Sequence, residues 1–307
     1  LEPGRMFLVD MEEGRIIEDR EVKEKIAAKH PYGDWLKENL LPLKEVPYTG
    51  NKTPVEAEPF IKRLQAFGYT EEDIKTLITP MSTLGKEAIG SMGTDTPLAV
   101  LSSKPQLLYN YFKQLFAQVT NPPLDGIREE IVTDTSMSVG SDANIFDVIP
   151  AHAKKLNIQN PIISNEDLDK IKFIEHDDFK SKSVKALYVA KEGNNGLERA
   201  LEDLLKSVVK EVEDGANIII LSDRGINKDM APMPMLLACA FVHHGVMKHN
   251  LRSKFGIIIE SAEPREPHHF ASLFGYGASA INPYMVNEII DYQVEKGAIK
   301  GLSAENA

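Results

Sequence analysis

Residues 215–225 read GANIIILSDRG, residues 232–254 read PMPMLLACAFVHHGVMKHNLRSK, and residues 255–283 read FGIIIESAEPREPHHFASLFGYGASAINP. Three apolar runs within them, at 217–221, 256–259 and 278–281, predict β-strands, and two helix-like stretches separate the runs. The run at 218–221 is apolar at successive positions, which indicates a strand buried on both faces, as in a parallel sheet.

Polar residues follow each of these predicted strands. In parallel α/β folds, ligands and reacting groups gather at the carboxyl ends of the strands. We therefore select these residues, with the charged residues and histidines that follow them, as the candidate site or domain-interface set. They are Ser222, Asp223, Arg224, Glu260, Ser261, Arg265, His268, His269 and Asn282.

The alternation of strand and helix continues upstream, with a strand at 185–190 and an amphipathic helix at 197–212. Such alternation is typical of parallel βαβ units with right-handed crossovers. A glycine-rich turn at Gly275 and Gly277 resembles turns near the phosphate sites of (β/α)8 barrels. Because only four to six strands can be counted, we predict an α/β fold with an incomplete or decorated (β/α)8 TIM-like barrel.

The first third of the chain predicts smaller elements. A short hairpin at residues 6–17 precedes a helix at 19–29 and another at 32–40. Residues 41–54 contain three prolines and predict a linker, so we place a domain boundary near residue 50, with residues 1–50 and 51–307 on either side.

Beyond the boundary the pattern is mixed. Helices are expected at 56–67 and 70–78, the second opened by Thr70 with Asp73 in a capping-box arrangement. An ordered loop is expected at 79–96, a strand at 97–101, a helix at 106–118 with Tyr109, Phe112 and Phe116 in the core, and a short strand at 160–164.

Composition excludes several classes of protein. The formal net charge of −11 among 307 residues argues against a nucleic-acid partner. No apolar run approaches the roughly 20 residues that span a bilayer, so we expect no membrane insertion. The single cysteine, Cys239, excludes an intramolecular disulfide framework, fits a cytoplasmic setting and lies in an apolar helix where a thiol is inert. The chain starts at Leu1, which suggests a fragment or a processed product.

Motifs for chemistry are sparse. The adjacent pairs His243-His244 and His268-His269 point about 100° apart on a helix, so neither pair alone suits a metal; we expect one histidine of each pair to pack inward. The acidic and basic residues from Asp223 to Arg265 predict a charge network, in which an arginine holds a carboxylate; a structural role for it outweighs an anion or ammonia site. The stretch GSMGTDT at 90–96 lacks the order of a phosphate-binding loop.

Four long strings then resemble the central domain of the glutamate synthase large chain: GSMGTDTPLAVLS at 90–102, YFKQLFAQVTNPPLDGIRE at 111–129, ANIIILSDRG at 216–225 and HHFASLFGYGASAINPY at 268–284. The opening PGRMFLVDMEEGRIIEDREVKEKIA at 3–27 resembles the trailing edge of the glutaminase domain that precedes it. The resemblance covers nearly the whole chain.

This resemblance implies a part of an enzyme that makes glutamate from glutamine and 2-oxoglutarate. The central domain would join the glutaminase and FMN-binding synthase domains and line the ammonia channel between them. It would hold no cofactor itself, since FMN and an iron–sulfur cluster belong to the synthase domain. No catalytic cysteine of the family is present, so this chain alone is predicted to be inactive. The electron donor, NADPH or ferredoxin, stays open.

The alternative is a free-standing (β/α)-barrel enzyme that acts on a small acid substrate, with Asp223, Glu260 and His268 as acid–base groups.

Overall fold

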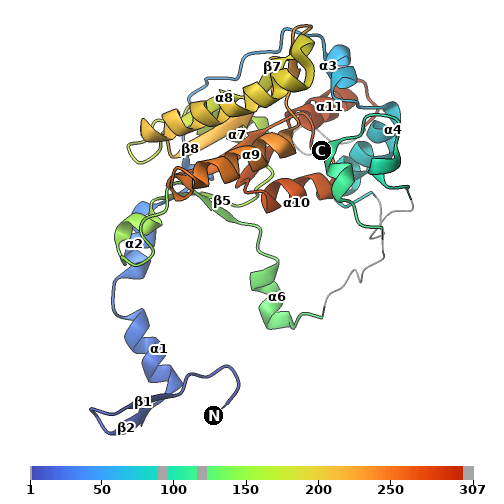
Figure 1. Ribbon diagram of the computed structural model, residues 1–307. Coiled ribbons are helices and arrows are strands. Elements are labelled where there is room, and N and C mark those ends of the chain that lie inside the picture. Colours follow the sequence, from blue (N-terminus) through green and yellow to red (C-terminus); the bar gives the residue numbers. More distant parts are fainter. Residues whose placement is uncertain (1, 89–95, 116–122, 300–307) are drawn as a thin grey trace.

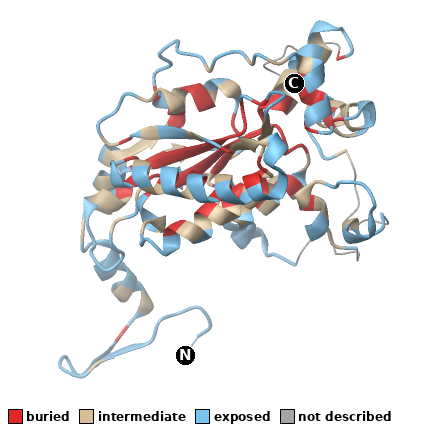
Figure 2. Ribbon diagram, turned by 45° about the horizontal axis from the view of Figure 1, so that its top comes forward, coloured by how far each residue is buried: buried red, intermediate tan, exposed pale blue. Residues whose placement is uncertain are grey.

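The computed structural model describes residues 2–88, 96–115 and 123–299. Its centre is a parallel sheet in which the described strands follow the order β11, β10, β8 and β6. The strand bounds are Ser181–Lys185 for β6, Ile218–Ser222 for β8, Gly256–Glu260 for β10 and Ala280–Asn282 for β11. Every residue of β8, β10 and β11 is buried, so the three strands predicted from the apolar runs are confirmed (Figure 2).

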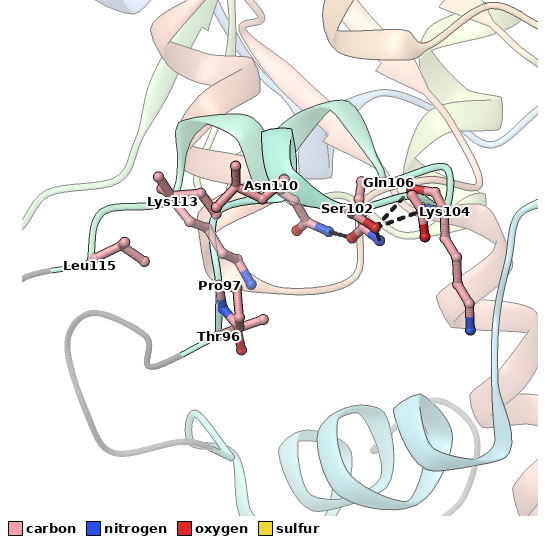
Figure 3. A pocket seen from close by; sticks show the side chains of 12 residues that line it. Thr96, Pro97, Ser102, Lys104, Gln106, Asn110, Lys113 and Leu115 are labelled. Carbon is pink, nitrogen blue, oxygen red and sulfur yellow. Dashed lines mark hydrogen bonds between the residues drawn. The ribbon is translucent and has the colours of Figure 1, made fainter.

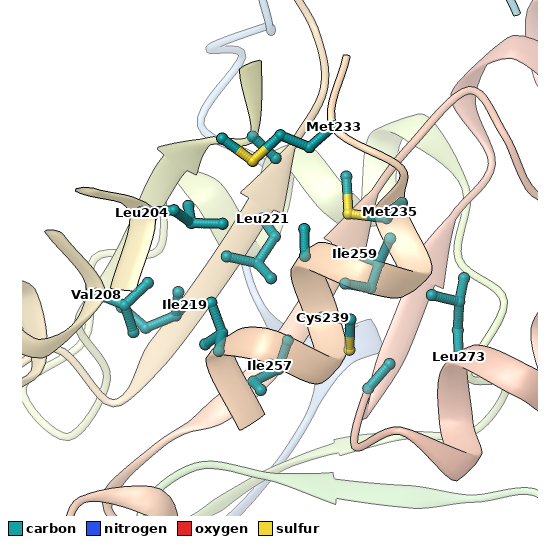
Figure 4. Close-up of a cluster of buried hydrophobic side chains, with 14 of the residues drawn as sticks. Leu204, Val208, Ile219, Leu221, Met233, Met235, Cys239, Ile257, Ile259 and Leu273 are labelled. Carbon is teal, nitrogen blue, oxygen red and sulfur yellow. The ribbon is translucent and has the colours of Figure 1, made fainter. Parts of the chain in front are cut away.

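Two apolar layers cover this sheet. On one face, Ile219, Leu221, Ile257 and Ile259 pack against three helices and the buried Cys239 (Figure 4). On the other face, alternate residues of the same strands pack against a helix and a second sheet. The helices are α8 (Gly193–Glu213), α9 (Met235–Met247) and α10 (Pro267–Gly275) on the first face and α7 (Asn165–Lys172) on the second. The α/β class with parallel βαβ units is therefore confirmed.

The second sheet corrects the linker prediction. Its order is β3 (Leu40–Pro42), β5 (Lys155–Ile158) and β4 (Met137–Val139), with β3 parallel and β4 antiparallel to β5. The predicted linker at 41–54 therefore begins inside a strand, and Leu43 and Val46 after it are buried. Their apolar side chains join the core beneath β8 and β10, which proline spacing alone does not reveal.

The described strands do not close into a barrel, so the TIM-like barrel remains a prediction. Beyond β6 the chain forms a small antiparallel pair, β7 (Leu187–Val189) with β9 (Met230–Pro232). At the opposite edge, the predicted strand at 160–164 makes only a single bridge, between Ile162 and Ile281.

Three further predictions differ from the structure. The predicted strand at 97–101 is instead a 3₁₀ turn, Ala99–Leu101, whose apolar side chains face solvent and pair with no strand of the described residues. The predicted helix at 106–118 is reduced to a 3₁₀ turn, Leu108–Phe112, whose Tyr109 is buried as expected while Phe112 is 49% exposed; Phe116 lies outside the described residues. The predicted loop at 79–96 begins with helix α5 (Thr79–Leu84), and residues 89–95 are not described.

Near the carboxyl ends of the strands, α3 (Phe60–Ala66) packs with α11 (Tyr284–Glu295) in a third apolar cluster. The predicted helix at 56–67 thus starts four residues late, at Phe60. The helix expected at 70–78 is present as α4 (Glu71–Asp73) followed by a π-helical turn, Ile74–Ile78, and the capping box of Thr70 and Asp73 is confirmed. These helices form a cap over the strand ends.

The N-terminal residues form an arm that extends away from this body (Figure 1). The arm contains the predicted hairpin, β1 (Leu8–Asp10) and β2 (Arg15–Ile17), and the predicted helix α1 (Asp19–Ala27). Helix α2 (Tyr32–Asn39) connects the arm to the body, and α6 (Gly126–Val132) stands apart on the same side (Figure 1). Among the described helices, none is long and apolar enough to cross a bilayer.

Candidate functional site at the carboxyl edge of the sheet

The structure brings the polar strand ends together at one edge of the sheet, which we call the carboxyl edge. Glu260 lies opposite both Ser222 and Asn282 in the strand register. The ladder continues past the strands, since the backbone N–H of Asp223 donates to Glu260 O at 3.2 Å and that of Ser261 to Asn282 O at 3.1 Å. The predicted convergence of these residues is therefore present.

Asp223 is fully buried and is held by hydrogen bonds, and no cation among the described residues forms an ion pair with it. Its carboxylate accepts bonds from the Ser261 hydroxyl at 2.6 Å and from the Ala262 N–H at 3.1 Å, and Tyr284 also donates to it. Burial raises the pKa of Asp223 to about 7, and the hydrogen bonds only partly oppose this rise. Asp223 therefore binds a proton more readily than an ordinary aspartate.

Glu260 has the opposite surroundings. Its Oε1 accepts from Arg224 Nε and from Lys172 Nζ, each at 2.6 Å, while the residue is only 1% exposed. Burial alone raises the pKa of Glu260, but the charges of Lys172 and Arg224 outweigh burial and leave the pKa below its usual value. Arg224 also stacks on the Tyr284 ring at 3.8 Å. Glu260 is thus the anionic centre of a buried ion-pair cluster.

Glu263 is a second buried carboxyl group that forms no ion pair within the described part of the chain. It accepts from the Met235 N–H at the start of α9 at 2.9 Å and lies 3.4 Å from the Tyr109 hydroxyl. Burial raises its pKa to about 7. This carboxyl group links the loop after β10 to α9.

Arg265 fastens the helical cap to the carboxyl edge. It donates to the backbone oxygens of Phe67 at 2.8 Å and Gly68 at 3.3 Å, just after α3, and lies 3.3 Å from Asp73 Oδ2. Its guanidinium also stacks over Tyr69 at 3.8 Å. The predicted charge network therefore exists, with Arg224 paired to Glu260 and Arg265 to Asp73, each through a single nitrogen–oxygen contact, and Arg265 also holds the carbonyls at the end of α3.

In each adjacent histidine pair one ring is more buried than the other, as the i,i+1 spacing predicts. His269 is buried, stacks on Tyr109 with ring centroids 4.4 Å apart and lies 2.9 Å from Glu266. His268 is half-buried and contacts the Tyr109 backbone oxygen at 2.9 Å. His243 accepts from Arg252 Nε at 2.9 Å. Within the described ranges, no three His, Cys, Asp or Glu side chains are grouped to hold a metal ion.

Asn282 completes the edge as a structural bridge. Its amide nitrogen donates to Ile163 O and to Asn165 Oδ1, each at 3.0 Å. Together with Ser222 and Ser261 it is at most 1% exposed. These three side chains are therefore packed into the edge.

Sequence reasoning missed four members of this edge. Lys172 comes from α7 and Glu56 from the segment before α3, while Tyr284 and Glu288 come from α11. None belongs to a motif, and their sequence spacing from Glu260 carries no signal because the fold alone brings them together. Tyr284, directly after Asn282-Pro283, is the one that a wider window at the strand end includes.

Two cavities of the structure are candidates for a ligand site. One of about 290 Å³ lies at the carboxyl edge, lined by Glu260, Arg224 and residues of α3, α7 and α11. A larger one of about 650 Å³ lies between the two 3₁₀ turns of residues 96–115 (Figure 3). The smaller cavity is lined by Arg224 and Glu260 of the candidate set, and the larger one by none of that set, so we place the candidate site at the smaller cavity.

The residues of this chain do not fit an iron–sulfur cluster, which needs several thiolates, because Cys239 is the single cysteine of the sequence. At the glycine-rich turn, Gly275 has open space around it, whereas Gly277 packs tightly. A Cβ at Gly277 would lie 2.1 Å from His243 Nδ1, and φ is +101°, so glycine is required there for packing against α9.

The amino-acid sequence of the chain matches two family models and several known proteins. The family model for the glutamate synthase central domain matches residues 62–307, and the model for class-II glutamine amidotransferases matches residues 1–35. The chain is 42% identical to the glutamate synthase [NADPH] large chain of Bacillus subtilis over 97% of the chain's length. It is 38% identical to the glutamate synthase [NADH] of Schizosaccharomyces pombe over 100% of its length. It is also 38% identical to ferredoxin-dependent glutamate synthase 2 of Synechocystis over 94% of its length. It covers 19%, 15% and 19% of those relatives, so it spans less than a fifth of their length.

Proposed function

The chain belongs to the glutamate synthase central-domain family, and from that premise we propose that it joins a glutaminase domain to an FMN-binding synthase domain. In this proposal residues 1–50 are the trailing edge of the glutaminase domain and the connection after it, of which residues 40–46 pack against the central body, and residues 51–307 are the central domain. The assembled enzyme would form glutamate from glutamine and 2-oxoglutarate in the cytoplasm. FMN and the iron–sulfur cluster would lie in the synthase domain.

The observation that carries the proposal is the N-terminal arm. Residues 1–35 match the amidotransferase family, and the described part of this segment leaves the body of the structure as a hairpin and a helix (Figure 1). Apolar side chains on the hairpin face solvent, with Phe7 56% and Ile16 60% exposed. On the same side of the body, Ile127 and Ile131 of α6 are 88% and 78% exposed. Apolar surface of this kind suits burial against other domains.

We further propose that the carboxyl edge lines the ammonia path or contacts a neighbouring domain through the selected set from Ser222 to Asn282. An uncharged molecule such as ammonia needs a shaped surface that excludes water more than it needs titratable groups. The mutual pairing of the charged side chains there is compatible with that role. The incomplete TIM-like barrel belongs to the same proposal, with β6, β8, β10 and β11 as its retained strands.

The connecting role is tested in the full-length enzyme by replacing Ile127 and Ile131 together with serine. We expect glutamine-dependent glutamate formation to fall while ammonia-dependent formation is retained, because the synthase domain itself is unaltered. Met247→Ser, which replaces a 45% exposed side chain on α9, is the matched control. An unchanged ratio of the two activities in the double variant would overturn the connecting role for this surface.

The channel placement is tested by Ser222→Leu and by the smaller change Ser222→Thr, each assayed for the same ratio. A selective loss of the glutamine-dependent activity supports the placement. Because Ser222 is buried, retained ammonia-dependent activity reports that the variant has folded. Intact glutamine coupling in a folded variant means that the channel lies elsewhere.

The free-standing enzyme is the second candidate. Of its three proposed acid–base groups, Glu260 lines the small cavity, whereas Asp223 and His268 do not. Incubation of the purified chain with FMN separates the two candidates, since tight stoichiometric binding would favour an enzyme of the flavin-barrel class.

A further inference from the structure

An apolar groove lies where the N-terminal arm meets the body, and we call it the α2 groove (Figure 1). Its volume is about 340 Å³. Its apolar lining comes from α2 and from the segment that leads into the 3₁₀ turn Pro150–Ala153, and consists of Tyr32, Trp35, Leu36, Ile145, Val148 and Ile149. Ile145 is 81% exposed and Val148 is 51% exposed, so this apolar surface is open to solvent.

The loop that carries these exposed side chains, residues 144–149, is fixed by its own hydrogen bonds. The Asp147 N–H donates to Asn144 O at 2.9 Å, and the Phe146 N–H donates to Asn144 Oδ1 at 3.2 Å. The ring of His152 contacts Asp147 O at 2.8 Å and Asn144 O at 3.1 Å. A surface that is already ordered loses little conformational freedom when a partner binds, so the loop presents its apolar side chains in a form suited to docking.

The side of the groove formed by α2 is aromatic. The rings of Tyr32 and Trp35 meet edge to face with centroids 5.5 Å apart, and the His30 ring lies 5.4 Å from that of Trp35. Tyrosine and tryptophan are enriched at the centres of protein interfaces. The polar residues of the lining, Asp147 and His152, are engaged within the loop, since Asp147 Oδ2 accepts from the Asn144 amide at 2.9 Å. The groove therefore suits an apolar protein surface.

The two family matches meet across this groove. Tyr32 and Trp35 belong to the segment that matches class-II glutamine amidotransferases, residues 1–35, whereas Ile145 and Val148 belong to the segment that matches the central domain. An amidotransferase domain that includes residues 1–35 therefore ends inside the groove. We propose that the α2 groove is the docking site on the central body for the amidotransferase domain of the same polypeptide. This inference rests on the proposed connecting function and names the surface that would perform it.

The first test replaces Ile145 with the photoreactive residue p-benzoylphenylalanine in the full-length enzyme and identifies the cross-linked peptides by mass spectrometry. We expect cross-links to the amidotransferase domain. Cross-links to the synthase domain or to a second enzyme molecule, or no cross-link, overturn the proposal. The same probe at Phe7 of the arm tests the proposed function separately. If Phe7 cross-links to the amidotransferase domain and Ile145 does not, the connecting role stands and the docking site is wrong; if neither does, both are wrong.

The second test combines Ile145→Ser with Val148→Ser in the full-length enzyme and measures trypsin cleavage after Lys29, an exposed residue between α1 and α2. Docking at the groove restrains this connection, so we expect cleavage in the double variant to be faster by about threefold or more. Leu84→Ser with Met247→Ser is the matched control, because these side chains are 62% and 45% exposed and do not line the groove. Equal cleavage rates in the two double variants would contradict docking at this site.

Discussion

Replacing Glu260 with glutamine tests whether the buried ion-pair cluster stabilises the carboxyl edge. The change keeps the size of the side chain but removes a negative charge that two cations share, each at 2.6 Å. Arg224 retains Glu56 and Glu288 at 3.5 Å and its stacking on Tyr284. Of the partners that the described residues offer, Lys172 retains the Thr53 hydroxyl at 2.9 Å. The lysine therefore loses more than the arginine.

The expected cost follows from these contacts. A charge-assisted hydrogen bond contributes about 1.5–3 kcal/mol, and breaking a buried pair by removing one partner costs about 3–5 kcal/mol. We expect Glu260→Gln to lower the free energy of unfolding by about 3–5 kcal/mol. Because burial already lowers the pKa of Lys172, part of the cost can be relieved by loss of its proton at alkaline pH. The deficit should shrink as the pH rises above neutrality.

The assay is equilibrium urea unfolding of the 307-residue chain, followed by far-ultraviolet circular dichroism. Glu198→Gln on the exposed face of α8 is the control and should change stability by less than about 0.5 kcal/mol. Adding Lys172→Met to Glu260→Gln removes the stranded cation and should recover part of the loss. A loss below about 1 kcal/mol for Glu260→Gln, with an unchanged denaturant slope, would refute the reasoning.

Three other measurements probe the same fold. Burial raises the pKa of Asp223 and of Glu263 to about 7, so both groups keep protons in the folded chain that the unfolded chain releases near pH 4. The resulting stability is present at low pH and is lost as the pH rises to 7, by about 1.4 kcal/mol per pH unit and group. Urea unfolding from pH 5 to 7 should show this decline, and Asp223→Asn should make the decline less steep. Burial raises the pKa of the Cys239 thiol to about 12, so iodoacetamide should label the native chain far more slowly than the urea-unfolded chain, and equal rates would contradict burial. Gly277→Ala places a Cβ 2.1 Å from the His243 ring at a residue whose φ is +101°. Thermal unfolding should show that the free energy of unfolding falls by about 1–3 kcal/mol or more. An unchanged melting temperature would show that the turn relaxes freely.

The central strands were predictable because their signal is local. Successive isoleucines at 218–220 and 257–259 leave no polar face, so only a strand covered on both sides accommodates them. The meeting of their polar ends follows from parallel pairing, which is why Asp223, Glu260 and Asn282 were found from the sequence. In these cases a short window of sequence contains the physical cause.

Other features depend on contacts that a short window does not contain. Lys172 reaches Glu260 across 88 residues, and Thr53 reaches Asp169 across 116. The strand at Leu40–Pro42 exists because β5 lies beside it, although the prolines at 42, 47 and 54 suggest a linker. The apolar run at 97–101 has no such neighbour among the described residues, and Val100 and Leu101 remain 70% and 75% exposed. Strand propensity without a partner produced the error there.

The contacts of Arg265 set an order of events during synthesis of the chain. Its guanidinium holds the backbone oxygen of Phe67, 198 residues earlier, and the Tyr69 hydroxyl reaches Ala262 O across 193 residues. At a ribosomal rate of about 5–20 residues per second, Phe67 emerges about 10–40 s before its partner. Helix α3 and the π-helical turn must wait through that interval with their apolar sides uncovered. The helical cap, although encoded early, can dock only after the last strands have been translated, and a chaperone that shields residues 60–78 would find its substrate in that interval.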